Sequence, residues 1–464
     1  MTAAIPAVPA DVLDAIVKAY DIRGLCPEQL DPPAARALGA AFAGFCGRPQ
    51  LVLGRDMRAS GVELAAAFAE GATAVGVDVV DIGLASTDLL YFASGRLDMP
   101  GAMLTASHNP ARYNGIKLCG RAAAPIGADS GLADIAAAAA SDIATLPPER
   151  RGRVSRRDLL EQFVEHVRSF VRIDDLAPLR VVADTANGMG GHVAPAVFDG
   201  LALRVELLYP ELDGTFPNHP ADPMQPENLA DLRAAVTAAG ADVGLAFDGD
   251  ADRVFLVDEK ANPVSGSLTT ALVATGTLAR EGPGPILHNL VCSRAVPEAV
   301  VAAGGTPVRT RVGHSYIKAA MAQTGAAFGG EHSGHYYFAR NFRADSGLIA
   351  ALVVLEQLSR ADVPLSQLLA PFDRYANLGE TNIPTPDPTA MIERAAAHYA
   401  AAEPGLAQDR LDGLTVEGAD WWFNLRPSNT EPLLRLNLEA DDAARLEQRR
   451  GELTALLEEN EQRR

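Results

Sequence analysis

One stretch of the sequence joins an apolar segment directly to three alternating aspartates: Val243-Gly244-Leu245-Ala246-Phe247-Asp248-Gly249-Asp250-Ala251-Asp252-Arg253. The small and apolar residues predict a short buried strand, and the acidic run that follows predicts a loop. Ligands of open α/β sheets gather at the carboxyl ends of strands. The stretch therefore predicts an α/β fold with a functional loop at the end of a strand.

The same arrangement occurs twice more along the chain. Met103-Leu104 leads into a loop around Ser107, and 326–328 leads into Gly330 to His335. Strand-like segments alternate with alanine-rich, helix-like segments in each region, a pattern typical of mostly parallel sheets with helices on both faces. The segments concerned are residues 51–53, 62–75 and 77–82, then 179–183 and 205–209, and then 286–328. We expect three related mixed α/β domains whose loops line one central cleft.

A fourth segment has a different pattern. Residues 388–402 predict a helix, and strands are predicted around Leu414, over 421–425 and over 433–438, with a charged helix after Asp441. This smaller unit is predicted to be α+β. The expected domains are residues 1–152, 153–258, 259–372 and 373–464.

Composition restricts the partners and the compartment. The formal net charge of -19 in 464 residues opposes binding to nucleic acid, which requires clustered Lys and Arg. No apolar run reaches the roughly 18 residues of a membrane span, and the first ten residues lack the basic start of a signal peptide. The four cysteines are widely spaced, without a CxxC pair, which favours reduced thiols. We expect a cytoplasmic protein that acts on small molecules.

The three aspartates predict a divalent-cation site. In an extended loop, alternate side chains project to one side, so Asp248, Asp250 and Asp252 can converge on one ion. Oxygen ligands suit Mg²⁺ or Ca²⁺ and not zinc. A plain acidic turn is the simplest alternative. An EF-hand fails because Arg253 stands where the turn glycine belongs, and a haloacid-dehalogenase-type phosphatase is disfavoured because the third acid suits a pure metal cage.

Ser107 is a candidate nucleophile in the segment Leu104-Thr105-Ala106-Ser107-His108-Asn109-Pro110. Pro110 disfavours helix at Asn109, so we expect an extended loop in which Ser107 and His108 point to opposite faces. A capping or solvated hydroxyl is the alternative. We prefer a serine that carries a phosphate, because such a group beside carboxylates requires Mg²⁺ and cations nearby. The candidate cations are Arg23, Lys117 and Arg253.

Two further loops carry groups that bind sugars and phosphates. Glu331 and Ser333, within Gly330-Glu331-His332-Ser333-Gly334-His335, suit vicinal sugar hydroxyls, whereas His335 is either a phosphate contact or structural. Arg426-Pro427-Ser428-Asn429-Thr430-Glu431-Pro432 combines a guanidinium, hydroxyls and an amide, as a phosphate cradle requires. A capped turn is the alternative for this last loop.

With all four loops in this order, the chain resembles the α-D-phosphohexomutase family over essentially its whole length. The resemblance implies four domains around a central cleft, the last of them α+β and related to the TATA-box-binding-protein-like fold. It also implies reversible, Mg²⁺-dependent transfer of phosphate between C1 and C6 of a hexose. A phosphoserine enzyme and a hexose 1,6-bisphosphate, which also serves as activator, are the implied intermediates.

The resemblance assigns a role to each loop. Ser107 would carry the phosphate, and Asp248, Asp250 and Asp252 would hold Mg²⁺ against it. Glu331 and Ser333 would bind the 3- and 4-hydroxyls of the sugar, and Lys117 or His335 would transfer protons. The phosphate that does not react would be held by Arg426, Ser428, Asn429 and Thr430. Further family positions along the cleft are Tyr20, Arg23, Arg253, His314 and His335.

The subclass follows from two local segments. Lys18-Ala19-Tyr20-Asp21-Ile22-Arg23-Gly24 resembles the opening of dual phosphomannomutase/phosphoglucomutases, and His332 departs from the Gln typical of phosphoglucosamine mutases. A phosphoglucosamine mutase, a Mg²⁺-dependent sugar-phosphate phosphatase and a non-catalytic sugar-phosphate sensor are the alternatives. Ala251 stands where many relatives have Gly. We expect a monomer that uses mannose or glucose phosphates.

Overall fold

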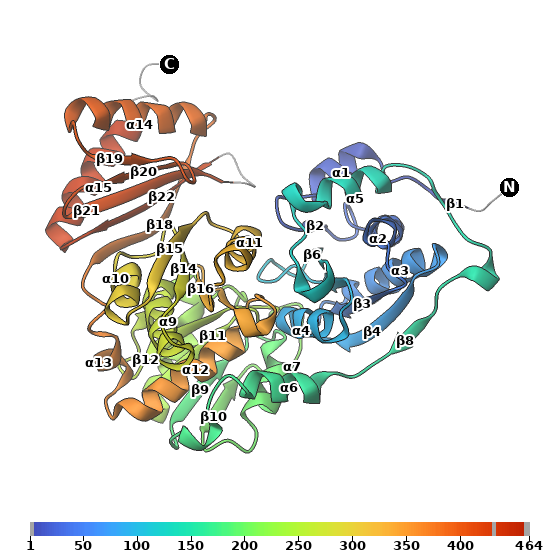
Figure 1. Cartoon of the computed structure of the whole chain (residues 1–464), viewed down its shortest axis with the longest axis horizontal. Coiled ribbons are helices and arrows are strands. Elements are labelled where there is room, and N and C mark those ends of the chain that lie inside the picture. Colours follow the sequence, from blue (N-terminus) through green and yellow to red (C-terminus); the bar gives the residue numbers. More distant parts are fainter. Residues whose placement is uncertain (1–3, 429–432, 459–464) are drawn as a thin grey trace.

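The computed structural model describes residues 4–428 and 433–458, which form four main sheets with helices packed against them (Figure 1). A two-stranded ribbon of β1 (Ala4–Ile5) and β7 (Ile143–Ala144) lies at the edge of the first unit. Among the described residues, no helix is long and apolar enough to cross a membrane.

The first sheet has the strand order β2-β6-β5-β3-β4-β8. Its central strands are parallel, and β6 runs antiparallel beside β5. The strands are β2 (Ile22–Leu25), β3 (Gln50–Arg55), β4 (Asp78–Leu84), β5 (Gly101–Leu104), β6 (Tyr113–Cys119) and β8 (Val154–Arg156). The helices are α1 (Ala10–Ile16), α2 (Pro32–Cys46), α3 (Ser60–Ala74), α4 (Thr87–Leu97) and α5 (Leu132–Ala139).

The second sheet has the order β10-β9-β11-β12-β13, with β12 antiparallel beside β11. Its strands are β9 (Arg180–Asp184), β10 (Arg204–Leu208), β11 (Val243–Phe247), β12 (Val254–Asp258) and β13 (Pro263–Val264). The helices of this unit are α6 (Leu160–Arg168), α7 (Gly190–Phe198) and α8 (Ala230–Ala239).

The third sheet repeats this plan with the order β15-β14-β16-β17, in which β17 runs antiparallel beside β16. Its strands are β14 (Pro285–Asn289), β15 (Thr306–Thr310), β16 (Phe328–Gly330) and β17 (Tyr336–Phe338). Its helices are α9 (Gly266–Glu281), α10 (Ala295–Ala302), α11 (His314–Thr324), α12 (Gly347–Ala361) and α13 (Leu365–Leu369). In all three units, a predicted functional loop joins a parallel strand to the antiparallel strand that follows it.

The fourth sheet is antiparallel throughout, with the order β18-β22-β21-β20-β19. Its strands are β18 (Ala376–Pro384), β19 (Ala407–Asp409), β20 (Leu414–Glu417), β21 (Trp421–Pro427) and β22 (Leu433–Ala440). The helices α14 (Pro388–Ala402) and α15 (Ala443–Glu458) pack against the sheet. Three related α/β units and one α+β unit are therefore confirmed.

Sheet membership extends past two of the expected boundaries. The edge strand β8 pairs with β4 after residue 152, and β13 pairs with β12 after residue 258. Both are strands of two or three residues, whose pairing is set by the neighbouring strand and not by a local pattern. The four residue ranges given for the domains stay predictions.

Side-chain caps define where several helices begin. The N-cap residues Asp31, Ser86, Ser265, Ser346 and Asp387 each accept a hydrogen bond from a backbone amide in the first turn of their helix. Such caps satisfy amides that the helix itself leaves unpaired. The caps at Ser86 and Ser346 also fix the two helices, α4 and α12, that lie next to the candidate site.

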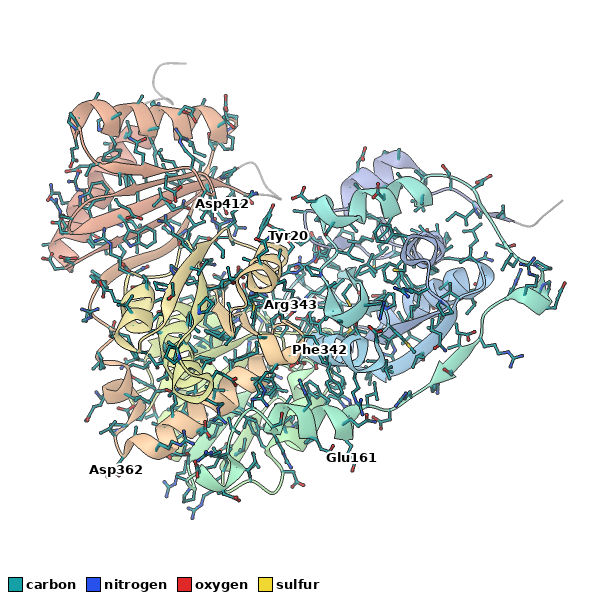
Figure 2. The ribbon with its side chains drawn as sticks, viewed as in Figure 1. Tyr20, Glu161, Phe342, Arg343, Asp362 and Asp412 are labelled. Atoms are coloured by element: carbon teal, nitrogen blue, oxygen red, sulfur yellow. The ribbon has the colours of Figure 1, made fainter. Side chains whose placement is uncertain are left out.

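One cluster of buried apolar side chains runs from the first sheet through the second to the third. Phe92 of α4 lies 5.8 Å from Phe163 of α6, and Phe170 lies 5.6 Å from Phe338 of β17, between ring centroids. Phe342 lies where the third unit meets the first (Figure 2). The fourth unit has its own core. The first three units therefore share a continuous interior, which fixes their functional loops relative to one another.

The fourth unit is attached by polar contacts. The amide of Val312 donates to the Asp412 carboxylate at 3.1 Å, and the carbonyl of Val312 accepts from the Tyr20 hydroxyl at 3.3 Å. Figure 2 shows Tyr20 and Asp412 on either side of this junction. Arg294 adds hydrogen bonds to the carbonyls of Gly418 and Trp421. Units one, three and four thus meet around Val312.

Candidate active site

Ser107 lies in a tight turn between β5 and β6, so the expectation of an extended loop is wrong. Its φ of 50° is in the left-handed region, and the Asn109 amide donates to the Ala106 carbonyl at 3.0 Å across the turn. The Ser107 amide donates to Thr105 Oγ1 at 2.9 Å. Backbone in this region is strained for a residue with a Cβ, and such strain is concentrated at functional sites.

Arg58 stabilises this turn through hydrogen bonds to its backbone, a role that the sequence did not indicate. Its buried guanidinium pairs with the buried Asp56 carboxylate at 3.1 Å. It also donates, at 2.6 to 2.9 Å, to the carbonyl oxygens of Ser107, Asn109, Pro110 and Tyr113. Apart from Asp56, the partners are backbone atoms, which carry no residue identity, so no motif could have indicated them.

The three aspartates converge as expected, but through a turn and not an extended loop. One oxygen each of Asp248, Asp250 and Asp252 lies within 4.8 Å of the others, and all three side chains are buried. Ala251 has a φ of 61°, in the left-handed region. That conformation favours glycine, the residue that many relatives have at this position.

The serine turn and the aspartate loop are in direct contact. Ser107 Oγ donates to Asp248 Oδ2 at 2.7 Å. A Cβ at Gly249 would lie 2.3 Å from the Ser107 carbonyl oxygen, so this approach of the two backbones requires glycine. The structure thus places the Ser107 hydroxyl against one carboxylate of the acidic triplet.

The arrangement of oxygens fits a hard divalent cation. Asp250 Oδ1 and Asp252 Oδ1 are buried and have no hydrogen-bond partner among the described residues. Their other oxygens accept from Lys117 Nζ at 2.6 and 2.7 Å. Buried carboxylate oxygens without a partner are costly unless a cation compensates them. The loop is thus able to bind a metal through oxygen ligands alone.

The three aspartates differ in pKa. Burial raises the pKa of Asp248 to about 6 and the pKa of Asp252 to about 7, and the charge of Asp250 adds to both shifts. Burial acts on Asp250 in the same direction, but the Lys117 ammonium lowers the pKa of Asp250 overall. The pKa of Lys117 is raised because Asp250 and Asp252 outweigh the effect of its burial. Lys117 is therefore a fixed positive charge.

Arg253 connects Asp248 to His108. Its Nε donates to Asp248 Oδ2 at 3.0 Å and its NH2 to His108 Nδ1 at 2.6 Å. His108 Nδ1 also lies 3.3 Å from Ser107 Oγ, so the expectation that Ser107 and His108 point to opposite faces is wrong. A guanidinium can only donate, so Nδ1 accepts from Arg253. Burial lowers the pKa of His108, which keeps the ring neutral.

The third loop presents Glu331 and Ser333 together. One oxygen of the buried Glu331 carboxylate accepts from the Gly313 amide at 2.9 Å. The other accepts from the hydroxyls of Ser333 and Tyr337, each at 3.3 Å. Burial raises the pKa of Glu331. Tyr337 is a further contact that the sequence did not indicate.

His335 lies between this loop and the aspartates. Its Nδ1 is 2.9 Å from Ser333 Oγ, and its Nε2 is 3.9 Å from Asp252 Oδ1. Burial lowers the pKa of His335, so the imidazole is neutral near pH 7. Asp345, which sequence reasoning missed, lies beside His335 and pairs with the buried Lys318 at 3.2 Å.

The remaining predicted residues of the first and third units surround these loops. Arg23 donates to Asn109 Oδ1 at 2.6 Å, which places it beside the serine turn. The rings of Tyr20 and His314 are 5.4 Å apart between centroids. Burial raises the pKa of Tyr20 to about 12 and lowers that of His314 to about 3, so both are neutral at pH 7.

The fourth predicted loop has hydrogen bonds within its own unit. Arg426 donates to Glu380 at 2.5 Å within its own unit, and the Ser428 amide donates to the Leu433 carbonyl at 2.9 Å. Asn429 and Thr430 lie outside the described residues. The role of this loop stays a prediction.

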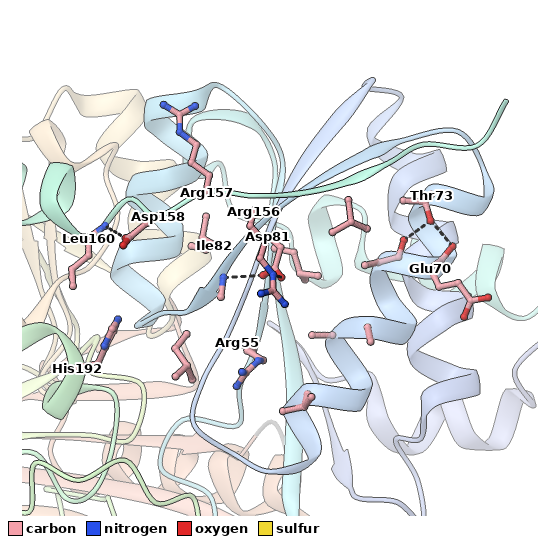
Figure 3. Close-up of a pocket in the computed structure, with 18 residues that line it drawn as sticks. Arg55, Glu70, Thr73, Asp81, Ile82, Arg156, Arg157, Asp158, Leu160 and His192 are labelled. Carbon is pink, nitrogen blue, oxygen red and sulfur yellow. Dashed lines mark hydrogen bonds and ion pairs between the residues drawn. The ribbon is translucent and has the colours of Figure 1, made fainter. Parts of the chain in front are cut away.

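A groove of about 900 Å³ lies elsewhere, between α3 and β8 (Figure 3). Its lining includes Arg55, Arg156 and Arg157, but also Glu70, Asp81 and Asp158, so its fixed charges balance apart from His192. No residue of the four predicted loops lines it. The groove is therefore separate from the candidate active site.

A serine turn, an aspartate loop and a Glu-Ser-His loop at equivalent hairpins of three α/β sheets define the phosphohexomutase class of proteins. The four domain families of phosphoglucomutase/phosphomannomutase match this chain in order: α/β/α domain I at residues 14–143, domain II at 161–262, domain III at 265–375 and the C-terminal domain at 380–456. The chain belongs to the phosphoglucomutase/phosphomannomutase family.

Known relatives match the chain over nearly all its length. A phosphomannomutase of Escherichia coli strain K12 is 40% identical, covering 95% of this chain and 98% of the relative. Phosphohexose mutases of Xanthomonas campestris are 39% identical, with the same coverage. The solved structure of a phosphoglucomutase/phosphomannomutase family protein from Burkholderia thailandensis has a TM-score of 0.86 and 34% identity, and covers 96% of this chain and 97% of its own.

Proposed function

We propose that this protein is an enzyme that interconverts hexose 1-phosphates and hexose 6-phosphates, through a phosphoserine at Ser107 and a hexose 1,6-bisphosphate. Mannose and glucose phosphates are the proposed substrates, and the 1,6-bisphosphate is the proposed activator. The observation that carries the proposal is the 2.7 Å contact between Ser107 Oγ and a carboxylate of the buried triplet. A hydroxyl at such a place serves phosphoryl transfer better than binding alone, because it lies within reach of a bound cation.

The local charges support a phosphorylated serine with Mg²⁺. Three carboxylates face the cations of Lys117 and Arg253, which leaves about one net negative charge when all are ionised. A dianionic phosphate on Ser107 and one Mg²⁺ add opposite charges of equal size, so the balance is unchanged. Asp248, Asp250 and Asp252 would hold the ion, which when bound neutralises charge on the transferring phosphate.

The chain's own cations would position that phosphate. Lys117 and Arg253 are fixed by their carboxylates, so they need little reorganisation when charge moves during transfer. In the reaction, the sugar hydroxyl oxygen bonds to phosphorus and the bond from phosphorus to Ser107 Oγ breaks. One proton leaves the sugar hydroxyl and one arrives at Ser107 Oγ, so the proton count is conserved.

We assign the first of these proton transfers to His335 and not to Lys117. Ser333 donates to Glu331, so His335 donates through Nδ1 to Ser333 Oγ and keeps Nε2 free as a base. Burial lowers the pKa of His335, whereas Lys117 stays protonated. Nε2 also faces the aspartate loop, beside which the phosphate on Ser107 would lie.

Glu331 and Ser333 would hold the sugar in two opposite orientations. The 1,6-bisphosphate must turn over between the two transfers, so the groups that bind it must accept either end. A carboxylate and a hydroxyl suit vicinal sugar hydroxyls, whose arrangement is similar in both orientations. Arg426, Ser428, Asn429 and Thr430 are the proposed holders of the phosphate that does not react.

The test is Ser107→Ala compared with a control variant at the exposed Ser141. We expect conversion of glucose 1-phosphate, with Mg²⁺ and glucose 1,6-bisphosphate present, to fall by at least about 1,000-fold, because the group that carries the phosphate is lost. Intact-mass measurement should show a species heavier by one phosphate in the wild type and in Ser141→Ala only. Wild-type rates in Ser107→Ala would refute the proposal.

The same assay separates the alternatives. Release of inorganic phosphate from glucose 1-phosphate without glucose 6-phosphate would indicate a phosphatase. Faster turnover of glucosamine 1-phosphate than of mannose and glucose 1-phosphates would indicate a phosphoglucosamine mutase. Binding of all three without turnover or serine phosphorylation would indicate a sensor.

A further inference from the structure

Two arginines face each other directly across the last hairpin of the fourth sheet. Arg426 of β21 and Arg435 of β22 are register partners, one pair before the hairpin loop. They share the sheet face that lies opposite the core of this unit, together with the next pair of that face, Asn424 and Asn437. Like charges placed directly opposite destabilise a sheet, so this pair requires compensation.

Glu380 of β18 supplies that compensation. Its two carboxylate oxygens accept from Arg426 at 2.5 Å and from Arg435 at 2.9 Å. Two guanidiniums thus share one carboxylate. The Nε of each arginine is buried and has no hydrogen-bond partner among the residues that the structure describes.

The arginine pair lies close to the sugar loop. Burial lowers the pKa of His332; the carboxylates of Glu380 and Glu439 act against this shift, and the Arg426 guanidinium adds to it. His332 follows Glu331 directly in the chain. The face of the fourth sheet that carries the arginine pair therefore lies near the loop proposed to bind the sugar.

We propose that Arg435 is a second phosphate-binding guanidinium, which acts together with Arg426, and that Glu380 is the internal counter-ion that holds both arginines before substrate binds. The inference rests on the proposed function, since the ligand is the non-reacting phosphate of the hexose phosphate. Two planar guanidiniums side by side match the oxygens of a phosphate dianion, and one carboxylate cannot use all their donors. Arg435 is the more accessible of the two, with 30% of its side chain exposed against 7% for Arg426.

Calorimetric titration with glucose 6-phosphate and with inorganic phosphate tests this without turnover. We expect Arg435→Ala to raise the Kd for both ligands about 10- to 100-fold, as loss of a charge-assisted bidentate contact implies. Arg435→Lys keeps the positive charge but lacks the paired N–H donors of a guanidinium, so it should recover only part of the affinity. Arg410→Ala, which breaks an exposed ion pair with Glu393 in the same unit, is the control and should bind like the wild type.

Glu380→Gln should change affinity in the opposite direction. Without its counter-ion the arginine pair is more positive, so inorganic phosphate should bind more tightly, while the Tm without phosphate falls. A purely structural ion cluster predicts a lower Tm in both Glu380→Gln and Arg435→Lys with no change in either Kd, and that result would overturn the inference. If the wild type binds sugar phosphate and the Arg435 variants bind it equally well, only this inference fails. If the wild type binds neither ligand, the proposed function fails with it.

Discussion

At the scale of single residues, burial decides which carboxylates of the aspartate loop are charged. Asp250 is kept ionised by Lys117, whereas burial raises the pKa of Asp248 to about 6 and of Asp252 to about 7. Without a metal, groups with raised pKa values stabilise the fold below their unfolded values, near 4, and lose that contribution as the pH rises through 6 to 7. A cation must displace the protons of Asp248 and Asp252.

Stabilisation by Mg²⁺ should therefore grow with pH. We expect the increase in Tm on adding Mg²⁺ to be larger at pH 7.5 than at pH 5.5, and the apparent Mg²⁺ affinity to rise up to about tenfold per pH unit for each proton displaced. Differential scanning fluorimetry with and without Mg²⁺ at constant ionic strength measures this. Asp252→Asn should lose most of the pH dependence. If Mg²⁺ raised the Tm by the same amount at both pH values, the assigned pKa shifts would be contradicted.

At the scale of elements, the strained serine turn depends on Arg58. This buried guanidinium ties β5 and β6 together below Ser107 through four backbone carbonyls and pairs with Asp56. The side chain is 1% exposed, so each of these hydrogen bonds is protected from water. Its removal leaves a buried carboxylate without a cation.

Arg58→Met should lower the free energy of unfolding by about 3 to 5 kcal/mol, measured by urea denaturation. Asp56→Asn combined with Arg58→Met should recover part of this loss, because no unpaired charge then remains. Arg121→Ala, which breaks an exposed ion pair with Asp98, is the control and should change stability little. If Arg58→Met lowered the free energy of unfolding as little as Arg121→Ala does, the serine turn would be held by other contacts.

At the scale of the whole molecule, the first turn of α4 is where three units meet. The Thr87 hydroxyl donates to Asp250 Oδ2 at 2.5 Å, and the Thr87 amide donates to the Asp250 carbonyl at 3.0 Å. Asp88 accepts from Ser346, the N-cap of α12, at 2.6 Å. One helix terminus thus fixes the aspartate loop and the third unit relative to the first.

Asp88 makes this junction sensitive to pH. Burial raises its pKa to about 7, so its stabilising contribution is complete below about pH 4 and is lost as the pH rises through 7. Asp88→Asn should remove this dependence and raise stability relative to the wild type more at pH 8 than at pH 5, by about 3 kcal/mol at most. Urea denaturation at both pH values measures the difference. Equal effects of the substitution at both values would show that Asp88 does not titrate in this range.

Local patterns predicted those features that depend on neighbours in the chain. The helix expected over 388–402 has the bounds of α14, and the segments 51–53 and 243–247 lie in β3 and β11. The side-chain types at Ser107 and at the three aspartates were enough to predict that they form one site. Few kinds of site combine a hydroxyl with alternating carboxylates. The family resemblance supplied their order and roles.

Tertiary structure alone decided the rest. The support of Arg58 and the neutral His335 arise from contacts between segments distant in sequence. The left-handed backbone at Ser107 and the opposed arginines at 426 and 435 depend on how one turn and one hairpin close. Their energies depend on burial and on backbone partners, which no spacing of side chains records. The sequence by itself thus determined which chemical groups the protein has, and folding determined which of them are charged, held and close enough to react.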